Sequence, residues 1–497
     1  MIINGISVRP GEGTERVISR AAKRSGKKVH NWRILKESID ARNKADIRLV
    51  YSLEINYDPE ESHCLEIPKA VSEDRPVVVG FGPCGIFAGL VLARAGLRPV
   101  ILERGDDVDR RLMKVRRFAS EGVLDTDSNV QFGEGGAGTF SDGKLTTGIK
   151  DSRMRFVLEE LAAHGGPQDI LYKAKPHIGT DVLREVVKSL RMEITALGGQ
   201  VIFGARVTGM EVSGNRMKAV EYVSEGQTVR LEASDLILAI GHSSRDTLLM
   251  LRESGIRMAQ KPFSMGVRVE HPQELIDIAQ YGRPAGELKL PPADYKLSYR
   301  TESGRGVYTF CMCPGGHVIV ASSEEGGVTT NGMSFHGRDS GFANSAVLCD
   351  LRPSDFGSDD VLAGMYLQRK YEQIAFQKAG GYHAPKTDWR SFRDGLAPDV
   401  TDCMPGFVAD SIREAMPAFG RKVRGFDSDD AAMYAVEARS SSPVRLLRDE
   451  DLRGGLMTGE TIEGFYPAGE GAGYAGGIVS AAVDGIRTAM KIIEKYQ

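Results

Sequence analysis

Four residues between positions 80 and 103 have the types and spacing of a dinucleotide site. Gly80, Gly82 and Gly85 form the pattern G-x-G-x-x-G directly after the apolar run PVVVG and at the start of an apolar helix pattern. The first glycine allows a tight turn, the second lets the backbone approach a pyrophosphate, and the third lets helix and strand pack closely. Glu103 ends the next expected strand, RPVILE, where a carboxylate can accept hydrogen bonds from both ribose hydroxyls. Together they predict a bound dinucleotide.

The remaining parts of this nucleotide-binding fold are scattered along the chain. ASDLILAIGHSS predicts a buried strand that ends near Gly241, and IEGFYPAGEGAGYAGGIVSAAVDGIRTAMKIIEKY predicts a strand, a glycine loop and a long closing helix. Simple NAD-dependent enzymes continue with further βαβ units at short spacing. Dispersed segments are instead typical of flavoproteins, in which several remote segments cover an extended FAD. No second strand–GxGxxG–helix unit follows, so we expect no dedicated NAD(P)H domain, while NAD(P)H as a transient electron donor stays open.

A second glycine-rich stretch, GEGGAGTFSDGKL at 133–145, lacks the strand and the helix that flank the first glycine motif. It follows DTDSNVQF rather than a buried strand and leads into TFSDGKLTTG rather than an apolar-striped helix. We therefore predict a loop whose small residues let the backbone run close to the flavin, with a mobile turn as the alternative. Gly136, Gly138, Thr139 and Ser141 are expected along the ribityl or ring edge, with Lys144 near N5.

Composition and charge exclude several classes of protein. The net charge is −3 and the isoelectric point about 6.4, so no overall field attracts nucleic acid or an anionic membrane. Residues 1–48 hold 12 Lys/Arg against 5 Asp/Glu, a local excess of +7, which is more typical of a solvated surface than of a nucleic-acid site. No secretory signal or membrane span is recognisable. The 6 cysteines include no CxxC and no zinc-site spacing, so we expect no metal and a reducing cytoplasm.

Several stretches resemble the bacterial FAD-dependent dehydrogenases of unassigned substrate, a branch of the glutathione-reductase-type two-dinucleotide-binding flavoproteins. The resemblance covers essentially the whole chain and rests on VVVGFGPCGIFAGLVLARAGLRPVILERG, GEGGAGTFSDGKL, KPHIGTDVL, LILAIGHSSRDT, GVRVEHPQ, CMCPGGHVIVASSEEGGVTTNGMS, EARSSSPVR and YPAGEGAGYAGGIVSAAVDGI. It implies fold and cofactor but no substrate.

The expected fold class is α/β. A Rossmann-like FAD-binding domain of the GR2 type carries an inserted α+β substrate domain and a small N-terminal α+β domain. The predicted boundaries are a small N-terminal domain at 1–70, a first FAD-binding part at 71–245, the inserted substrate or cap domain at 246–456, and the C-terminal FAD-binding part at 457–497. Residues 59–76 are expected to form a linker after the first domain.

The resemblance also implies positions around the cofactor. Glu103, with Arg104 beside it, would hold the FAD ribose, Val207 would face the adenine, and Gly241 would pass near the pyrophosphate. Glu470 would meet the ribityl chain, where many relatives carry Asp, and the closing helix would point its N-terminus at the flavin N1–C2=O edge. The expected cofactor contacts are Gly80, Gly82, Pro83, Cys84, Gly85, Glu103, Arg104, Gly136, Gly138, Thr139, Ser141, Lys144, Val207, Gly241, Gly469, Glu470, Gly477 and Ile478.

The substrate side is expected in the inserted region. GVYTFCMCPGGHVIV predicts a hairpin that turns at residues 314–316, and the polar stretch after it predicts either a surface loop or a wall facing the flavin. Asn331, Arg338 and Asn344 are its candidate substrate contacts. Glu437 and Arg439 in EARSSSPVR suit an anionic or carbonyl-bearing substrate, with a buried ion pair as the alternative.

Few residues are candidates for acid–base chemistry. Lys144, His177 and Arg439 are the catalytic candidates, although a flavin contact suits Lys144 better than proton transfer and His177 could be structural, as could His271. Cys311 and Cys313 are spaced so that they share a face of a strand. We expect both to be small buried hydrophobic residues rather than electron carriers, and Cys84 to be packed as well.

The function hypothesis is an FAD-dependent oxidoreductase, or dehydrogenase, that transfers a hydride at flavin N5 to or from an unidentified small molecule. One alternative is a flavin-dependent C=C reductase or desaturase of the geranylgeranyl-reductase-like type, which a large apolar cavity would support. An alternative of another class is an RNA-associated flavin-binding protein that uses its basic N-terminal domain. Nucleic acid and membrane are not the expected partners, and the oligomeric state is left open.

Overall fold

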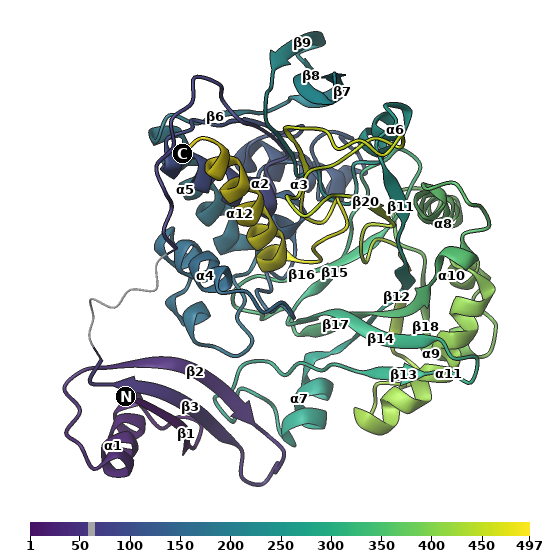
Figure 1. Ribbon diagram of the computed structural model, residues 1–497. Helices are drawn as coiled ribbons and strands as arrows, with labels where there is room; N and C mark the ends of the chain where they lie inside the picture. Colours follow the sequence, from purple (N-terminus) through teal and green to yellow (C-terminus); the bar gives the residue numbers. More distant parts are fainter. Residues whose placement is uncertain (58–64) are drawn as a thin grey trace.

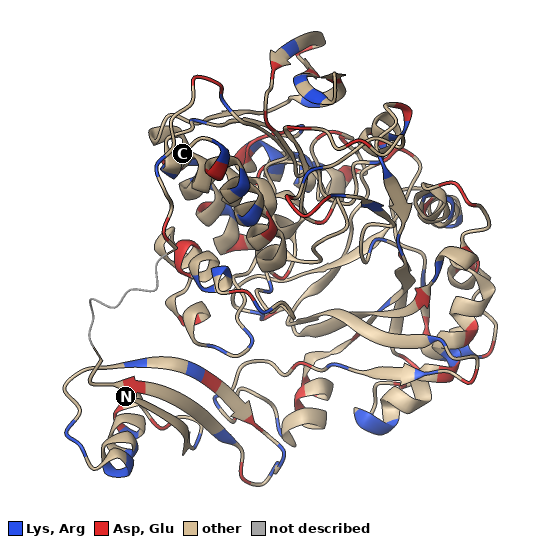
Figure 2. Cartoon of the chain, viewed as in Figure 1, with Lys and Arg blue, Asp and Glu red and all other residues tan. Residues whose placement is uncertain are grey.

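The computed structural model describes residues 1–57 and 65–497 (Figure 1). Its N-terminal part is a small antiparallel sheet in the order β1-β3-β2, made of β1 (Ile2–Val8), β2 (Trp32–Asp40) and β3 (Arg48–Ile55). Helix α1 (Thr14–Ser25) packs on this sheet through Val17 and Ala21. Lys and Arg are spread over α1, β2 and β3 and are mixed with acidic residues (Figure 2). The part of the expected linker at 59–64 lies outside the described residues.

A parallel sheet of five strands forms the centre of the larger body. Its order is β21-β10-β4-β5-β6, and every neighbouring pair is parallel. Such sheets are covered on both faces, which explains why most of the strands are fully buried apolar runs. The strands are β4 (Val77–Val79), β5 (Val100–Leu102), β6 (Gln200–Ile202), β10 (Leu236–Leu238) and β21 (Phe465–Pro467). This is the expected Rossmann-like α/β fold.

The two faces of the parallel sheet have different covers. Val78, Ile101 and Ile237 point to a helical layer of α2 (Pro83–Ala95), α4 (Arg153–Ala163), α5 (Thr180–Ala196) and α12 (Ile478–Lys495). The alternate residues, among them Val77 and Leu236, pack against an antiparallel meander of β7 (Arg206–Ser213), β8 (Arg216–Ser224) and β9 (Gln227–Glu232). Nearby lie α3 (Val108–Glu121), α6 (Arg245–Glu253), β11 (Met258–Gln260) and β20 (Val444–Leu446).

A six-stranded antiparallel sheet forms the other side of the molecule. Its order is β13-β14-β17-β12-β19-β18, from β12 (Phe263–Pro272), β13 (Ser298–Arg300), β14 (Gly306–Pro314), β17 (Phe342–Leu351), β18 (Lys386–Asp388) and β19 (Ala432–Glu437). Its core is completed by α7 (Gln273–Tyr281), α8 (Ala363–Ala379), α9 (Trp389–Arg393), α10 (Pro398–Thr401) and α11 (Gly406–Lys422). Among the described residues, no helix is both long and apolar enough to cross a membrane.

The hairpin predicted at 314–316 is wrong. Strand β14 already has β13 on one edge and β17 on the other, so no edge is free for the segment that follows it. That segment, β15 (His317–Val320), leaves the sheet and pairs with β16 (Thr330–Met333) as a separate ribbon. The stretch expected as an irregular loop or wall therefore contains β16 and the first residues of β17.

The closing helix α12 lies directly against α2. At their contact a Cβ on Gly485 would collide with the backbone carbonyl of Cys84, so this crossing requires a residue without a side chain. We predict that Gly485→Ala lowers the free energy of unfolding by about 1–2 kcal/mol, because overpacking costs about 1–3 kcal/mol and alanine regains about 0.5–1 kcal/mol as the better helix former.

Urea unfolding followed by circular dichroism measures this loss. Gly286→Ala is the matched control, because a Cβ there meets nothing within 4 Å and the backbone is not left-handed. Equal stability of the two variants would contradict the packing argument.

Candidate functional site

A cavity of about 790 Å³ lies between the parallel sheet and the six-stranded sheet. Its volume is within the range of about 300–1,000 Å³ that is usual for cofactor and ligand sites. One end is lined by the residues that follow the carboxyl ends of β4, β5 and β10, where open α/β sheets bind ligands. The other end is lined by β14, β16 and the end of β19.

The G-x-G-x-x-G loop turns into α2 at this cavity. Gly80 has φ +98°, and a Cβ there would collide with the carbonyl O of Ala239 at the end of β10. Gly82 is the N-cap of α2. A Cβ built on Gly82 would lie 3.6 Å from the Cα of Gly136. Two glycine loops therefore meet backbone to backbone. Gly85 does not line the cavity, because it packs on the carbonyl of Gly80 and holds the turn closed.

Glu103 lies at the end of β5 with its buried carboxylate in the cavity wall. Oε2 accepts a hydrogen bond from the backbone N–H of Phe81 at 2.7 Å, and Oε1 accepts from those of Gly105 and Gly133, each at 2.9 Å. A carboxylate offers about four acceptor positions, so one remains for a ligand. The side chain of Arg104 binds Asp127 and Asp246 instead and joins their two segments.

Of the five cofactor contacts expected from the 133–145 loop, four line the cavity, namely Gly136, Gly138, Ser141 and Lys144. Thr139 was expected among them but is fully buried and turned away from the cavity. Its hydroxyl donates to the carbonyl O of Glu134 at 3.3 Å, and its own carbonyl accepts from Thr180. The short 3-10 turn at 136–140 explains the difference, because it points successive side chains in different directions.

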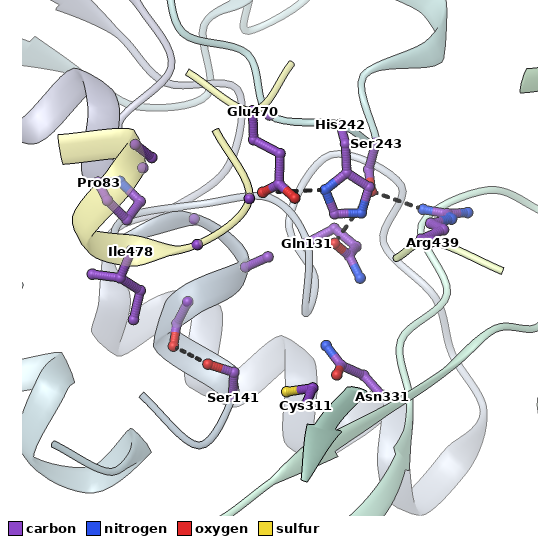
Figure 3. Close-up of a pocket in the computed structure, with 18 of the residues that line it drawn as sticks. Pro83, Gln131, Ser141, His242, Ser243, Cys311, Asn331, Arg439, Glu470 and Ile478 are labelled. Atoms are coloured by element: carbon purple, nitrogen blue, oxygen red, sulfur yellow. Dashed lines mark hydrogen bonds and ion pairs between the residues drawn. The ribbon is translucent and has the colours of Figure 1, made fainter. Parts of the chain in front are cut away.

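The C-terminal glycine loop leads to the N-terminus of α12. Gly476 and Gly477 line the cavity, and a Cβ on either would meet nothing within 4 Å. Gly469 does not line it, since its N–H donates to Asp484 at 2.8 Å and its backbone lies over Cys84. Glu470 does line it, and its Oε2 lies 3.6 Å from Nδ1 of His242 (Figure 3).

The polar end of the cavity is built around Asp142. Its carboxylate lies 3.1 Å from Nζ of Lys144 and 2.6 Å from Nη2 of Arg338 and also accepts a hydrogen bond from Ser334. Burial raises the pKa of Asp142, but Lys144 and Arg338 outweigh it and hold that pKa well below its usual range. Burial lowers the pKa of Lys144, but nearby thiols and Asp142 outweigh it and raise that pKa. Lys144 is therefore an ammonium donor at neutral pH, not a base.

Of the four substrate candidates, Asn331, Arg338 and Glu437 line the cavity. Both oxygens of Glu437 accept from Arg268, at 2.9 and 3.0 Å, so Glu437 is in a buried ion pair, but its partner is Arg268 and not Arg439. Asn344 does not line the cavity. It lies inside the six-stranded sheet, fully buried, with Oδ1 accepting from Arg268 at 2.7 Å.

His177 is not in the cavity either. Its ring stacks on His336 with 5.3 Å between centroids, and burial together with Arg338 lowers its pKa to about 4. His271 is buried in the second core, with Nε2 bonded to the carbonyl of Phe426 at 2.8 Å. Neither histidine lines the cavity.

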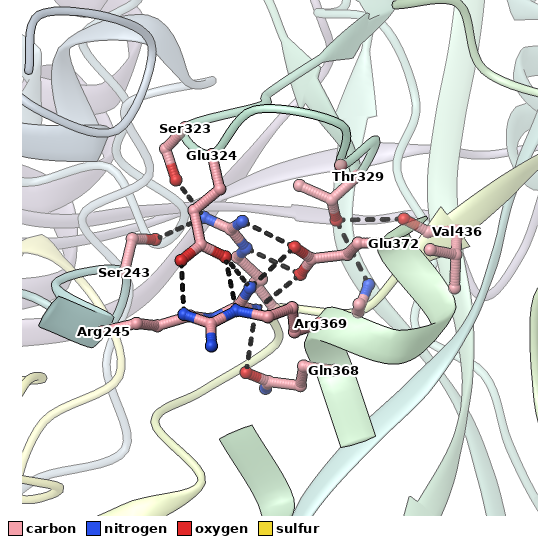
Figure 4. Close-up of polar contacts among 12 residues, drawn as sticks. Ser243, Arg245, Ser323, Glu324, Thr329, Gln368, Arg369, Glu372 and Val436 are labelled. Atoms are coloured by element: carbon pink, nitrogen blue, oxygen red, sulfur yellow. Dashed lines mark hydrogen bonds and ion pairs between the residues drawn. The ribbon is translucent and has the colours of Figure 1, made fainter. Parts of the chain in front are cut away.

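Arg439 lines the cavity, but its guanidinium is bound in a buried charge cluster around Glu372, and Figure 4 labels Arg245, Glu324 and Glu372 of this cluster. It donates to both oxygens of Glu372, at 2.7 and 2.8 Å, and to Ser243 and Ser323. Arg245 binds the same carboxylate from the other side. Arg439 thus holds the 243–245 segment in place and has no free face for a substrate anion.

Many cavity residues were not predicted from the sequence, and Gln131, Asp142 and His242 are polar residues among them. His242 directly follows the predicted strand end at Gly241, and Asp142 stands two residues before Lys144 in the glycine-rich loop. Their positions beside predicted contacts are signals that could have identified them. Cys84 and Val207 line the cavity as expected, and so do Pro83, Gly241 and Ile478.

Comparison with known proteins identifies the family. Residues 262–440 match the model of the FAD-dependent protein, C-terminal domain-like family, and residues 3–56 match a domain of unknown function, DUF8436. An uncharacterized protein of Clostridium beijerinckii is 45% identical over 97% of this chain and 96% of its own. The chain belongs to a family of FAD-dependent proteins.

Other similarities to this FAD-dependent chain are weaker. A probable electron transfer flavoprotein-quinone oxidoreductase of Escherichia coli is 28% identical over 40% of this chain and 43% of its own. A flavoprotein/dehydrogenase structure from Cytophaga hutchinsonii has 13% identity and a TM-score of 0.38, over 85% of this chain and 79% of that one. Neither similarity identifies a substrate.

We predict that Arg439→Met lowers the free energy of unfolding of the apoprotein by about 3 kcal/mol. Removing one partner of a buried ion pair typically costs about 3–5 kcal/mol, and Arg245 still compensates Glu372. Arg369→Met is the matched control, since its pair with Glu324 is 28% exposed on both sides and such pairs contribute about 0–1 kcal/mol. Chemical denaturation measures both losses. An Arg439 variant as stable as the control would return this residue to the substrate candidates.

Proposed function

We propose that the protein is an FAD-dependent oxidoreductase that exchanges a hydride with a polar small molecule. Bound FAD would supply two-electron chemistry at its N5 atom. The observation that supports this most is the division of one cavity into a backbone-lined end with two helix N-termini and a charged end on the antiparallel sheet. A dinucleotide and a substrate need these two surfaces next to each other.

The backbone-lined end fits FAD. The N-termini of α2 and α12 both open onto it, and helix N-termini bind anionic groups through their free N–H groups and dipole. Gly241, Gly476 and Gly477 line it with open space where a Cβ would stand. Nε2 of His242 is buried there with no hydrogen-bond partner within the described part of the chain.

Most of the predicted cofactor contacts line this one cavity, and we propose them as the residues that hold FAD. They are Gly80, Gly82, Pro83, Cys84, Glu103, Arg104, Gly136, Gly138, Ser141, Lys144, Val207, Gly241, Glu470, Gly477 and Ile478. Gly85, Thr139 and Gly469 support the walls from behind. Glu103 would bind a single ribose hydroxyl strongly, because backbone N–H groups occupy its other acceptor positions.

The charged end supports a polar substrate. Asn331 and Arg338 offer N–H donors that could orient a carbonyl or carboxylate group, and the Lys144 ammonium adds a positive charge. Asp142 is held as a carboxylate by its two cationic neighbours, so it fixes their positions instead of taking a proton. A lipid substrate of a C=C reductase would need an apolar wall, and these charges favour the oxidoreductase with a polar substrate. NADH or NADPH would act as a transient donor from this same end.

Glu103 tests the cofactor site. In Glu103→Gln a neutral amide replaces the carboxylate that accepts from the backbone N–H groups. The hydrogen bonds to these groups and the expected hydrogen bond to the ribose therefore both weaken. A hydrogen bond to a charged group is worth about 1.5–3 kcal/mol, so we expect FAD to bind about tenfold to a hundredfold more weakly. Fluorescence of released FAD measures the dissociation constant. Glu73→Gln, at an exposed position, is the control, and equal affinity in both variants would remove Glu103 from the site.

Anaerobic reduction of the purified holoprotein tests the activity. We expect the yellow flavin absorbance to bleach with NADH, NADPH or one member of a panel of polar metabolites, and Arg338→Met to slow the reaction of that substrate while FAD stays bound. Protein that carries FAD but bleaches only with a chemical reductant such as dithionite would contradict the proposal.

A further inference from the structure

Two cysteines meet the substrate end of the cavity at an irregularity in β14. The pairing of β14 with β17 shifts register between Phe310 and Cys313, and Cys311 has the left-handed φ of +43°. In a regular strand Cys311 and Cys313 would share one face. The bulge separates them, so that Cys311 lines the cavity near Asn331 (Figure 3) while Cys313 is completely buried behind it.

The two cysteines have cationic neighbours on two other segments. Nζ of Lys144 lies 3.9 Å from Sγ of Cys313 and also donates to the carbonyl O of Met312. Arg268, on β12, donates to the carbonyl O of Cys311 at 3.2 Å, and Sγ of Cys313 lies 3.3 Å from that same oxygen. Asp142 is the acidic group on this side and already binds Lys144 and Arg338, while Glu437 binds Arg268.

These neighbours act on the two thiols in opposite directions. The hydrogen-bonding Cys313 side chain lowers the pKa of Cys311 to about 6, against burial and with help from Lys144 and Arg268. The same contact and burial raise the pKa of Cys313 well above its usual value. These contacts therefore favour the thiolate form of the cavity-facing sulfur and the thiol form of the buried one. An accessible thiolate attacks disulfides, and a neighbouring thiol can resolve the product.

We propose that Cys311 and Cys313 are a redox-active dithiol that reduces a disulfide-bearing substrate at this end of the cavity. The Cys311 thiolate attacks one sulfur of the substrate disulfide, that S–S bond breaks, and one half leaves as a thiolate. Cys313 gives its proton to this thiolate and attacks Sγ of Cys311. The second half leaves as a thiolate, and the two electrons that reduce the substrate come from the dithiol, which is oxidised to the Cys311–Cys313 disulfide.

This proposal names a substrate class for the proposed oxidoreductase and rests on that function for the return of two electrons to the dithiol. One round of exchange needs only the chain's own thiols. The described cysteines outside the pair do not compete, because Cys84, Cys349 and Cys403 are buried and burial raises the pKa of each thiol. Cys64 lies outside the described residues, so every test variant also carries Cys64→Ser.

The test treats native holoprotein with the aromatic disulfide 5,5′-dithiobis(2-nitrobenzoate) and follows thionitrobenzoate release. With both cysteines present we expect two equivalents and a chain lighter by two hydrogens. Cys313→Ala and Cys313→Ser should release one equivalent and keep the other half on Cys311, as mass spectrometry shows, and Cys311→Ser should release neither. Cys403→Ser is the matched control and should behave as the parent.

The pH profile of the reaction is a second readout. Alkylation of Cys311 by iodoacetamide should have its midpoint near pH 6 and move to higher pH in Cys313→Ala and in Lys144→Met. A parent protein that stops at one equivalent with a stable mixed disulfide, or whose Cys311 alkylates with the midpoint of about 8.5 of a free thiol, overturns the proposal. Flavin bleaching by a donor without a disulfide would then leave the oxidoreductase function standing.

Discussion

The cavity depends on close contact between backbones that are far apart in the sequence. A Cβ on Gly80 would collide with Ala239 at the end of β10, and one on Gly485 would collide with Cys84 at the start of α2. These contacts bring the first βαβ unit, the returning strand and the closing helix to one point. Because side chains are missing there, peptide N–H groups and two helix N-termini form the surface instead. A site made in this way suits a large anionic cofactor without needing a cluster of basic side chains.

The opposite wall obeys a different constraint, the cost of burying charge. Arg268 binds Glu437, and Arg245 and Arg439 share Glu372, all of them nearly or fully buried. Such pairs hold geometry more than they add stability, since desolvation offsets much of their attraction. These pairs neutralise Glu437 and Arg439, which the sequence suggested as substrate contacts. What remains facing the cavity is the group around Asp142, where Arg338 still has N–H donors to spare.

The dinucleotide-binding loop was predictable because its conformation depends on residues that are close together in the sequence. The loop from Gly80 to Gly85 and Glu103 belong to one βαβ unit, in which strand, turn and helix are adjacent, and the fold class followed from them. His177 and Asn344 were misplaced because the direction of a side chain depends on partners distant in sequence, here His336 and Arg268. Thr139 was misplaced because the 3-10 turn at 136–140 turns its side chain away from the cavity. Cys311 lines the cavity and Cys313 is buried because of a bulge in β14, and the regular alternation expected along a strand does not predict such a bulge.

The small N-terminal domain is also connected to the cavity through backbone hydrogen bonds. Residue Glu37 on β2 exchanges backbone hydrogen bonds with Tyr172 and Ala174, each at 2.8 Å, so the strand edge extends onto the segment before Lys175. Lys175 lines the cavity and binds Asp294 across its rim at 2.6 Å. A shift of the small domain would therefore move one side of the rim. Its strand edge therefore helps to position Lys175 on this side of the rim.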